Sequence, residues 1–243
     1  MEPAAYSPNY KVVSSTKGSS SLNISVALLK PGGEVKSDTY VKLKEKEPGK
    51  LTFLESKPEF SKNLSTSIES IMINKGYKVV GAYESWEAMT YDDKKSIDFL
   101  VIPEFNLKDT GGIGYNTTPP LDVGLATLQP GEVSCSGSVN LKGDLGFTIL
   151  EPLSREKIFV KKFDLGESSP IEINVEIEYG SSAYVPVDEL NNSCVEAWNN
   201  TASKSLENIY NKFIETFQNY FPESEEAKML SKQVHQLKSL KRF

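Results

Sequence analysis

Residues 171–220 read IEINVEIEYGSSAYVPVDELNNSCVEAWNNTASKSLENIYNKFIETFQNY. Over 171–179 apolar and polar residues alternate strictly, which predicts a strand with one buried and one solvated face. After Asp188, a suitable N-cap residue, the apolar residues recur every three or four positions, which predicts one long helix ending before Pro222. The helical stripe consists of Leu190, Cys194, Trp198, Ala202, Leu206, Ile209, Phe213, Phe217 and Tyr220. The stretch therefore predicts a sheet with a long helix packed on one face.

The chain before residue 171 contains short strand-like segments separated by turn residues, a pattern that favours antiparallel pairing. The predicted strands are 22–29, 51–55, 77–83, 96–107, 121–128, 132–141, 146–151 and 157–165. Pro103 should restrict its strand to a sheet edge or a bulge. Residues 34–50 carry many charges and are expected to form an exposed hairpin or loop. A helix with an apolar stripe from Phe60 to Met72 should end at Gly76.

A last helix is predicted over residues 223–241, with acidic residues first and lysines later, an order that complements the helix dipole. Its apolar stripe favours docking on the body over pairing with another chain or lying on a membrane. The predicted fold class is α+β: a mostly antiparallel sheet with helices packed on one face and two long C-terminal helices. Residues 1–20 are expected to be a flexible tether and residues 21–243 a single domain.

Composition narrows the class of protein. The 243 residues are 38% hydrophobic, and the net charge of −6 argues against a nucleic-acid partner. No apolar run is long enough to span a bilayer. The two cysteines, Cys135 and Cys194, allow one disulfide, although two buried free thiols are the favoured interpretation.

Catalytic and metal-binding signatures are missing. His235 is the only histidine, so no histidine-based metal site is possible, and no GxSxG motif is present. Cys194 lies in the apolar helical stripe, where a thiol is normally a packing residue and not a nucleophile. We therefore predict no catalytic residues, no metal ligands and no cofactor, and we expect a protein that is not an enzyme.

Residues 108–120, KDTGGIGYNTTPP, are the candidate ligand-binding loop. They fail as a phosphate-binding loop because no lysine follows Gly114, and as a dinucleotide-binding loop because Thr117 replaces the third glycine. Glycans are held by aromatic rings, hydroxyls and amides, which this loop offers. The candidate glycan ligands are Lys108, Tyr115, Asn116, Thr117 and Thr118. The alternative, a plain turn without a ligand, is favoured.

Three stretches resemble the neuraminyllactose-binding hemagglutinin (HpaA) family of bacterial surface lipoproteins. They are LTFLESKPEFSKNLSTSIESIMINKGYKVVGAYES at 51–85, YDDKKSIDFLVIPEFNL at 91–107 and GFTILEPLSREKIFVKKFDL at 146–165. Family members associated with hemagglutination carry a short Lys/Arg-rich segment after the strand that LVIPEFNL resembles. Residues 108–120 stand in that place with one lysine and no arginine, so the chain resembles a paralogue of the adhesin with a changed binding face.

The resemblance implies a non-enzymatic lipoprotein, acylated on a cysteine that precedes residue 1, in the outer membrane or flagellar sheath. It implies attachment to sialylated host glycans, with the membrane contacted through the lipid. The alternative is a structural or assembly component of the cell envelope that binds protein or lipid and no sugar.

Overall fold

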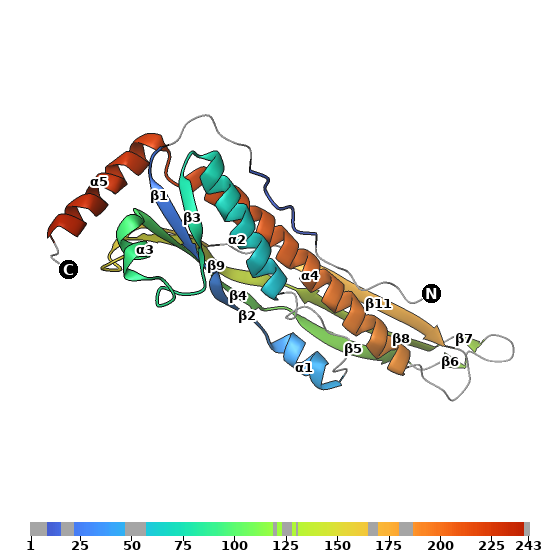
Figure 1. The fold of residues 1–243 in the computed structure, drawn as a ribbon. Coiled ribbons are helices and arrows are strands. Elements are labelled where there is room, and N and C mark those ends of the chain that lie inside the picture. The colour runs from blue at the N-terminus through green and yellow to red at the C-terminus, as the bar shows by residue number, and fades with distance from the viewer. Residues whose placement is uncertain are drawn as a thin grey trace.

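The computed structural model describes residues 9–15, 22–46, 57–118, 121–122, 128–129, 131–164, 170–179 and 187–240 (Figure 1). The helices are α1 (Asp38–Lys46), α2 (Lys57–Asn74), α3 (Tyr91–Ser96), α4 (Val187–Tyr220) and α5 (Ser224–Leu240). The strands are β1 (Ser25–Leu29), β2 (Gly32–Ser37), β3 (Lys78–Tyr83), β4 (Phe99–Asp109), β5 (Gly112–Thr118), β6 (Leu121–Asp122), β7 (Leu128–Gln129), β8 (Gly131–Val139), β9 (Leu141–Leu150), β10 (Lys157–Asp164) and β11 (Ile171–Tyr179). The predicted strand at 51–55 lies outside the described residues.

The two main sheets are joined by short connections between their strands. One has the strand order β10-β9-β4-β1-β3 with β2 also paired to β4, and the other has the order β11-β8-β5. Only Thr110 and Gly111 separate β4 from β5, and only Asn140 separates β8 from β9. The second sheet therefore continues the first as a three-stranded arm (Figure 1). Pairing is parallel around β1 and β2 and antiparallel elsewhere, as the mostly antiparallel prediction required.

Pro103 lies in a central strand, so the prediction that it marks an edge or bulge was wrong. β4 pairs with β9 on one side and with β1 and β2 on the other. β1 pairs with residues 99–101 of β4 and β2 with residues 104–109, so Pro103 falls in the gap between them. Because none of the described strands pairs with residue 103 on that side, the missing N–H of the proline costs no ladder hydrogen bond there.

The stretch from Lys108 to Thr118 is strand except for Thr110 and Gly111, and not the predicted loop. The chain continues from β4 into β5 across the two residues Thr110 and Gly111, which follow the buried Asp109. Asp109 Oδ1 accepts hydrogen bonds from Gly111 N (2.9 Å) and Asn140 N (3.0 Å), and Oδ2 accepts from Ser37 Oγ (2.9 Å). A Cβ on Gly111 would lie 1.9 Å from the carbonyl oxygen of Ser138, so glycine is needed here for the close approach of the chain to β8.

The region 34–50 was also predicted wrongly, as far as residue 46, where the description stops. It forms most of β2 and the helix α1, whose Tyr40 and Leu43 are buried. The rings of Tyr40 and Trp198 lie 6.2 Å apart, centroid to centroid. The charged segment is therefore a helix that buries Tyr40 and Leu43, three residues apart, in the main core.

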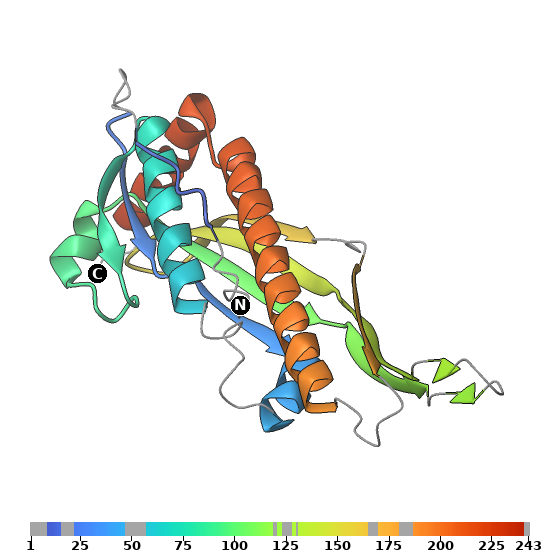
Figure 2. The same cartoon turned by 90° about the vertical axis from the view of Figure 1, so that its right-hand side faces the viewer.

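The core lies between the sheet and the layer formed by α2 and α4 (Figure 2). We call the sheet face under these helices the inner face and the opposite one the outer face. The predicted stripe of α4 is buried except for the exposed Tyr220. Helix α2 gives way to the predicted glycine, Gly76, at a positive φ of 89°. Within residues 9–15, Tyr10 is buried against Phe60 of α2 and Tyr210 of α4.

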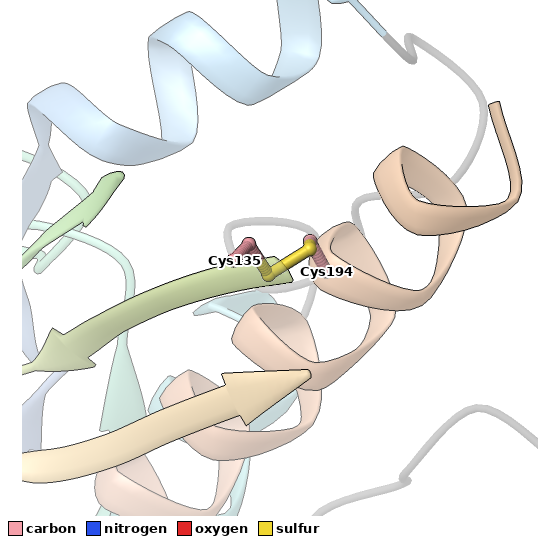
Figure 3. Close-up of a disulfide and its surroundings, with 2 residues drawn as sticks. All are labelled: Cys135 and Cys194. Carbon is pink, nitrogen blue, oxygen red and sulfur yellow. A yellow bond between two sulfur atoms is a disulfide. The ribbon is translucent and has the colours of Figure 1, made fainter. Parts of the chain in front are cut away.

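The two cysteines form a disulfide, so the favoured interpretation of free thiols was wrong (Figure 3). Cys135 lies on the inner face of β8 and Cys194 on the stripe of α4, with both side chains buried. Their Cα atoms are 6.4 Å apart, within the range that a disulfide spans. The bond attaches the three-stranded arm to the first half of α4.

Helix α5 docks on the body, as predicted. Ala227, Leu230 and Val234 are buried in the main core. Lys238 Nζ donates hydrogen bonds to the carbonyl oxygens of Lys95 (3.0 Å) and Ile97 (2.6 Å). Among the helices that the structure describes, none is long and apolar enough to cross a membrane.

Candidate functional site

An open groove of about 480 Å³ lies on the outer face, where β2 and β4 meet the segment after β3. Its floor is formed by outward-facing residues of β4 and by the glycines that begin β2. The residues with recognition chemistry in its lining are Lys30, Glu84, Ser85, Trp86, Glu87, Glu104, Asn106 and Arg155. The groove therefore combines an indole ring with a guanidinium, an amide, a hydroxyl and several carboxylates.

Trp86 is the aromatic element of the groove and is held in place from several sides. Its Nε1 donates a hydrogen bond to the carbonyl oxygen of Pro152 (2.6 Å). Lys94 Nζ lies 3.4 Å from the centroid of the ring, and the guanidinium carbon of Arg155 lies 5.1 Å from it. Both cations are within cation–π range. A capping box between Thr90 and Asp93 fixes the turn of α3 that carries Lys94.

Arg155 is presented by a tight turn. Its φ of +60° is uncommon for a residue with a side chain and costs about 1 kcal/mol or more. Two backbone hydrogen bonds close the turn, from Arg155 N to Glu151 O and from Glu151 N to Glu156 O, both 2.9 Å. The carboxylate of the fully buried Glu151 accepts from the backbone N–H groups of Leu153 and Ser154. These hydrogen bonds hold the strained conformation of Arg155, which places its guanidinium over Trp86.

The nearby ion pairs are weak. Arg155 Nη1 lies 3.9 Å from Glu87 Oε1, and both side chains are more than half exposed. Lys30 pairs with Glu84 at 2.9 Å, again at the surface. Exposed pairs of this kind contribute about 0–1 kcal/mol. The guanidinium of Arg155 can therefore exchange Glu87 for another anion at little cost.

A row of three lysines lies beside the groove on the same face. Lys108 of β4 is the register partner of Lys36 in β2 and of Lys142 in β9. Lys36 forms an ion pair with Glu34, and the hydrogen bond and charge of Glu34 raise the pKa of the Lys36 ammonium. We call Lys36, Lys108 and Lys142 the lysine row.

The five predicted glycan ligands do not gather in one place. Lys108 is in the lysine row, while Asn116 and Thr118 follow on the outer face of β5, the first eight residues or about 26 Å further along. Tyr115 and Thr117 lie on the inner face, as the register partners of Cys135 and Val133. Burial raises the pKa of the Tyr115 hydroxyl. One small ligand cannot contact both faces of the sheet, so only Lys108 is next to the groove.

Sequence reasoning missed the residues that form the groove, because they come from separate parts of the chain. Trp86 and Arg155 are 69 positions apart, and Lys36 and Lys142 meet Lys108 only through strand pairing. One signal was available. The chain has only two tryptophans, and Trp86, unlike Trp198, belongs to no apolar periodicity.

No family model matches the chain, and no curated protein sequence matches it. Among solved structures it is similar to a neuraminyllactose-binding hemagglutinin homologue from Helicobacter pylori, with a TM-score of 0.42, 16% identity and coverage of 89% of this chain and 97% of that one. It is similar to a protein from Xanthomonas campestris with a TM-score of 0.31, 10% identity and coverage of 89% and 98%. A third similar structure is the rare lipoprotein B from Shewanella oneidensis, with a TM-score of 0.22, 9% identity and coverage of 79% and 94%.

Proposed function

We propose that this protein is a non-enzymatic binding protein of the cell envelope whose groove at Trp86 holds an acidic saccharide, such as the sialylated end of a host glycan. The observation that carries the proposal is the groove itself. An aromatic ring, a guanidinium and an amide converge there on an open sheet face. Saccharide sites commonly combine a ring that stacks on an apolar sugar face with side chains that bind hydroxyls.

Each side chain has a part in this proposal. The sugar ring stacks on Trp86 and displaces the guanidinium of Arg155 from the ring, because that cation lies further from the ring than Lys94 does. The guanidinium then leaves Glu87 and binds the saccharide carboxylate in a bidentate manner. Asn106 and Glu104, which project from β4 into the groove, bind hydroxyl groups.

The disulfide supports an extracytoplasmic location. Disulfides persist in the periplasm and on cell surfaces and are rare in the cytosol. Attachment by an N-terminal lipid to the outer membrane or flagellar sheath, as the family resemblance implies, fits a protein that meets glycans outside the cell. A single open groove binds weakly, so many copies on one membrane would supply the avidity needed for adhesion.

Binding to immobilised sialylated and desialylated glycans, with the protein displayed in many copies, tests the proposal. We expect Trp86→Ala to weaken binding to the sialylated set at least about tenfold, from the loss of roughly 1.4 kcal/mol of ring contact. Trp86→Phe should retain part of the binding because it keeps a ring.

Two further variants complete this test. Arg155→Gln should remove the preference for sialylated over desialylated glycans, since it removes the cation but not the ring. Tyr115→Ala, on the inner face of β5, is the matched control and should bind like wild type. If Trp86→Ala binds as well as wild type, or if no glycan binds at all, the proposal is wrong.

The edge of β5 favours a second candidate function, that of an envelope assembly component. Among the described strands β5 pairs only with β8, and none of its seven residues is charged. The edge strand β10 carries three lysines, which discourage strand addition. An uncharged edge would accept an extended segment of a partner protein. Protease treatment of intact cells separates the two functions, because a surface adhesin is digested and an inward-facing component is protected.

A further inference from the structure

We infer that Lys238 of α5 is a positioning residue of the groove, because it holds the two structures that place cations over Trp86. These structures are the C-terminal end of α3, which carries Lys94, and the turn at residues 151–156, which carries Arg155. Helices α3 and α5 lie at the same end of the molecule (Figure 1). The inference rests on the proposed function only for the saccharide with which binding is measured.

The ammonium group of Lys238 binds the C-terminal end of α3. Lys238 Nζ donates hydrogen bonds to the carbonyl oxygens of Lys95 (3.0 Å) and Ile97 (2.6 Å). Carbonyl groups at the end of a helix have no partners within the helix, and a cation there also complements the helix dipole. A capping box fixes the other end of α3. These contacts fix the backbone that carries Lys94, whose ammonium lies 3.4 Å from the centroid of the Trp86 ring.

A second contact anchors the same part of α5. His235 Nε2 lies 3.3 Å from Asp98 Oδ1, in the residue that precedes β4. Asp98 Oδ2 accepts hydrogen bonds from Ser25 N (2.8 Å) and Ser25 Oγ (2.9 Å), so this carboxylate is itself held by β1. His235 is three residues before Lys238 and therefore lies on the same side of the helix. The contact keeps the last turns of α5, and with them Lys238, against the end of α3.

The same ammonium group acts on the turn that carries Arg155. Burial lowers the pKa of the Lys238 ammonium, and the negative charges of Glu151 and Asp98 act in the opposite direction. Glu151 is fully buried, and its carboxylate accepts hydrogen bonds from two backbone N–H groups of the turn. A buried carboxylate is stable only where hydrogen bonds and positive charge replace its lost water. Lys238 therefore supplies positive charge to the carboxylate that shapes the turn.

Both structures meet at Trp86. The turn accepts the hydrogen bond of Trp86 Nε1 at the carbonyl oxygen of Pro152 (2.6 Å), and it presents Arg155 at 5.1 Å from the ring centroid. Lys94 reaches the same ring from α3. Lys238 does not line the groove, but it contacts or charges each structure that orients the indole. Without Lys238 the ring and its two cations should be less ordered, so a ligand would have to order them when it binds.

Acrylamide quenching of tryptophan fluorescence, measured without any ligand, tests the positioning role. Lys238→Met keeps an apolar side chain of similar length and removes the ammonium. We expect it to raise the quenching constant, because the Trp86 ring becomes more accessible while Trp198 stays fully buried. Lys232→Met, at an exposed position of the same helix, is the matched control and should behave like wild type. Lys238→Arg should restore most of the wild-type value, because it keeps the positive charge and N–H donors.

A double-mutant cycle identifies the groups through which Lys238 acts. In the Lys94→Met/Arg155→Gln background, Lys238→Met should change the quenching constant little, because the cations that it positions are already absent. Saccharide affinity is the second readout. Lys238→Met should weaken binding of a sialylated oligosaccharide about fivefold or more, since two long side chains then have to be ordered on binding. Lys232→Met should bind like wild type.

The outcomes separate this inference from the proposed function. If Lys238→Met has the wild-type quenching constant, or if it acts equally in both backgrounds, Lys238 does not position Trp86, even where saccharide binding that depends on Trp86 persists. If the quenching constant changes as expected but no saccharide binds, the proposed function fails and the positioning role remains.

Discussion

Replacing Cys135 and Cys194 together with alanine is expected to lower the free energy of unfolding by up to about 4 kcal/mol. The bond joins residues 59 positions apart, and the chain-entropy model assigns a stabilisation of that size to a loop of this length. Both side chains are fully buried between the arm and α4. Urea unfolding of the double variant and of the oxidised wild type measures the difference.

Amide hydrogen exchange will identify the elements that lose stability in the double variant. Amide protection should drop most in β8 and in the first half of α4, which the disulfide attaches to each other. Wild type treated with a reductant is the control and should approach the double variant. A double variant within about 1 kcal/mol of the oxidised wild type would contradict the role given to the disulfide.

Replacing Asp109 with alanine is expected to destabilise the protein by about 3 kcal/mol. The buried carboxylate is the shared acceptor for Ser37 Oγ and for the backbone N–H groups of Gly111 and Asn140. Its removal leaves three donors without that acceptor, at roughly 1 kcal/mol or more each. Thermal unfolding followed by circular dichroism measures the loss.

The variant Asp109→Asn separates the effect of the acceptor from that of shape. Its amide oxygen can still accept from Gly111 N and Asn140 N, while the amide nitrogen faces Ser37. We expect about half of the loss seen with alanine. If the alanine and asparagine variants are both as stable as wild type, the carboxylate does not stabilise the connection between β4 and β5.

The elements with long, clear periodicity were predictable from the sequence. The strict alternation of residues 171–179 and the stripe of α4 gave β11 and the main helix nearly to their ends. Elements whose structure depends on distant partners were not. The glycines around Gly111 were interpreted as a turn because they usually form one, but here the closeness of Ser138 requires glycine in the short connection between two strands. The strand containing Pro103 was wrongly predicted to lie at a sheet edge or to contain a bulge, because the gap between β1 and β2 cannot be recognised from the neighbouring residues in the sequence.

The candidate site was less predictable than the fold for the same physical reason. The stretch 108–120 shows one lysine in the sequence, and the lysine row forms only when β2, β4 and β9 align. Tyr115 was chosen as a ligand because aromatic residues are common in glycan sites, but strand alternation turns it towards the inner face. Arg155 reaches Trp86 because of a turn built on the buried Glu151.

The central claim is that a saccharide covers Trp86, and quenching of tryptophan fluorescence by acrylamide tests it most directly. Trp198 is fully buried, so in wild type the quencher reports mainly on Trp86, which lines the open groove. We predict that a saturating concentration of a sialylated oligosaccharide lowers the quenching constant and that Arg155→Gln weakens this protection. A quenching constant that stays the same while the oligosaccharide is shown to bind would place the ligand elsewhere and contradict the claim.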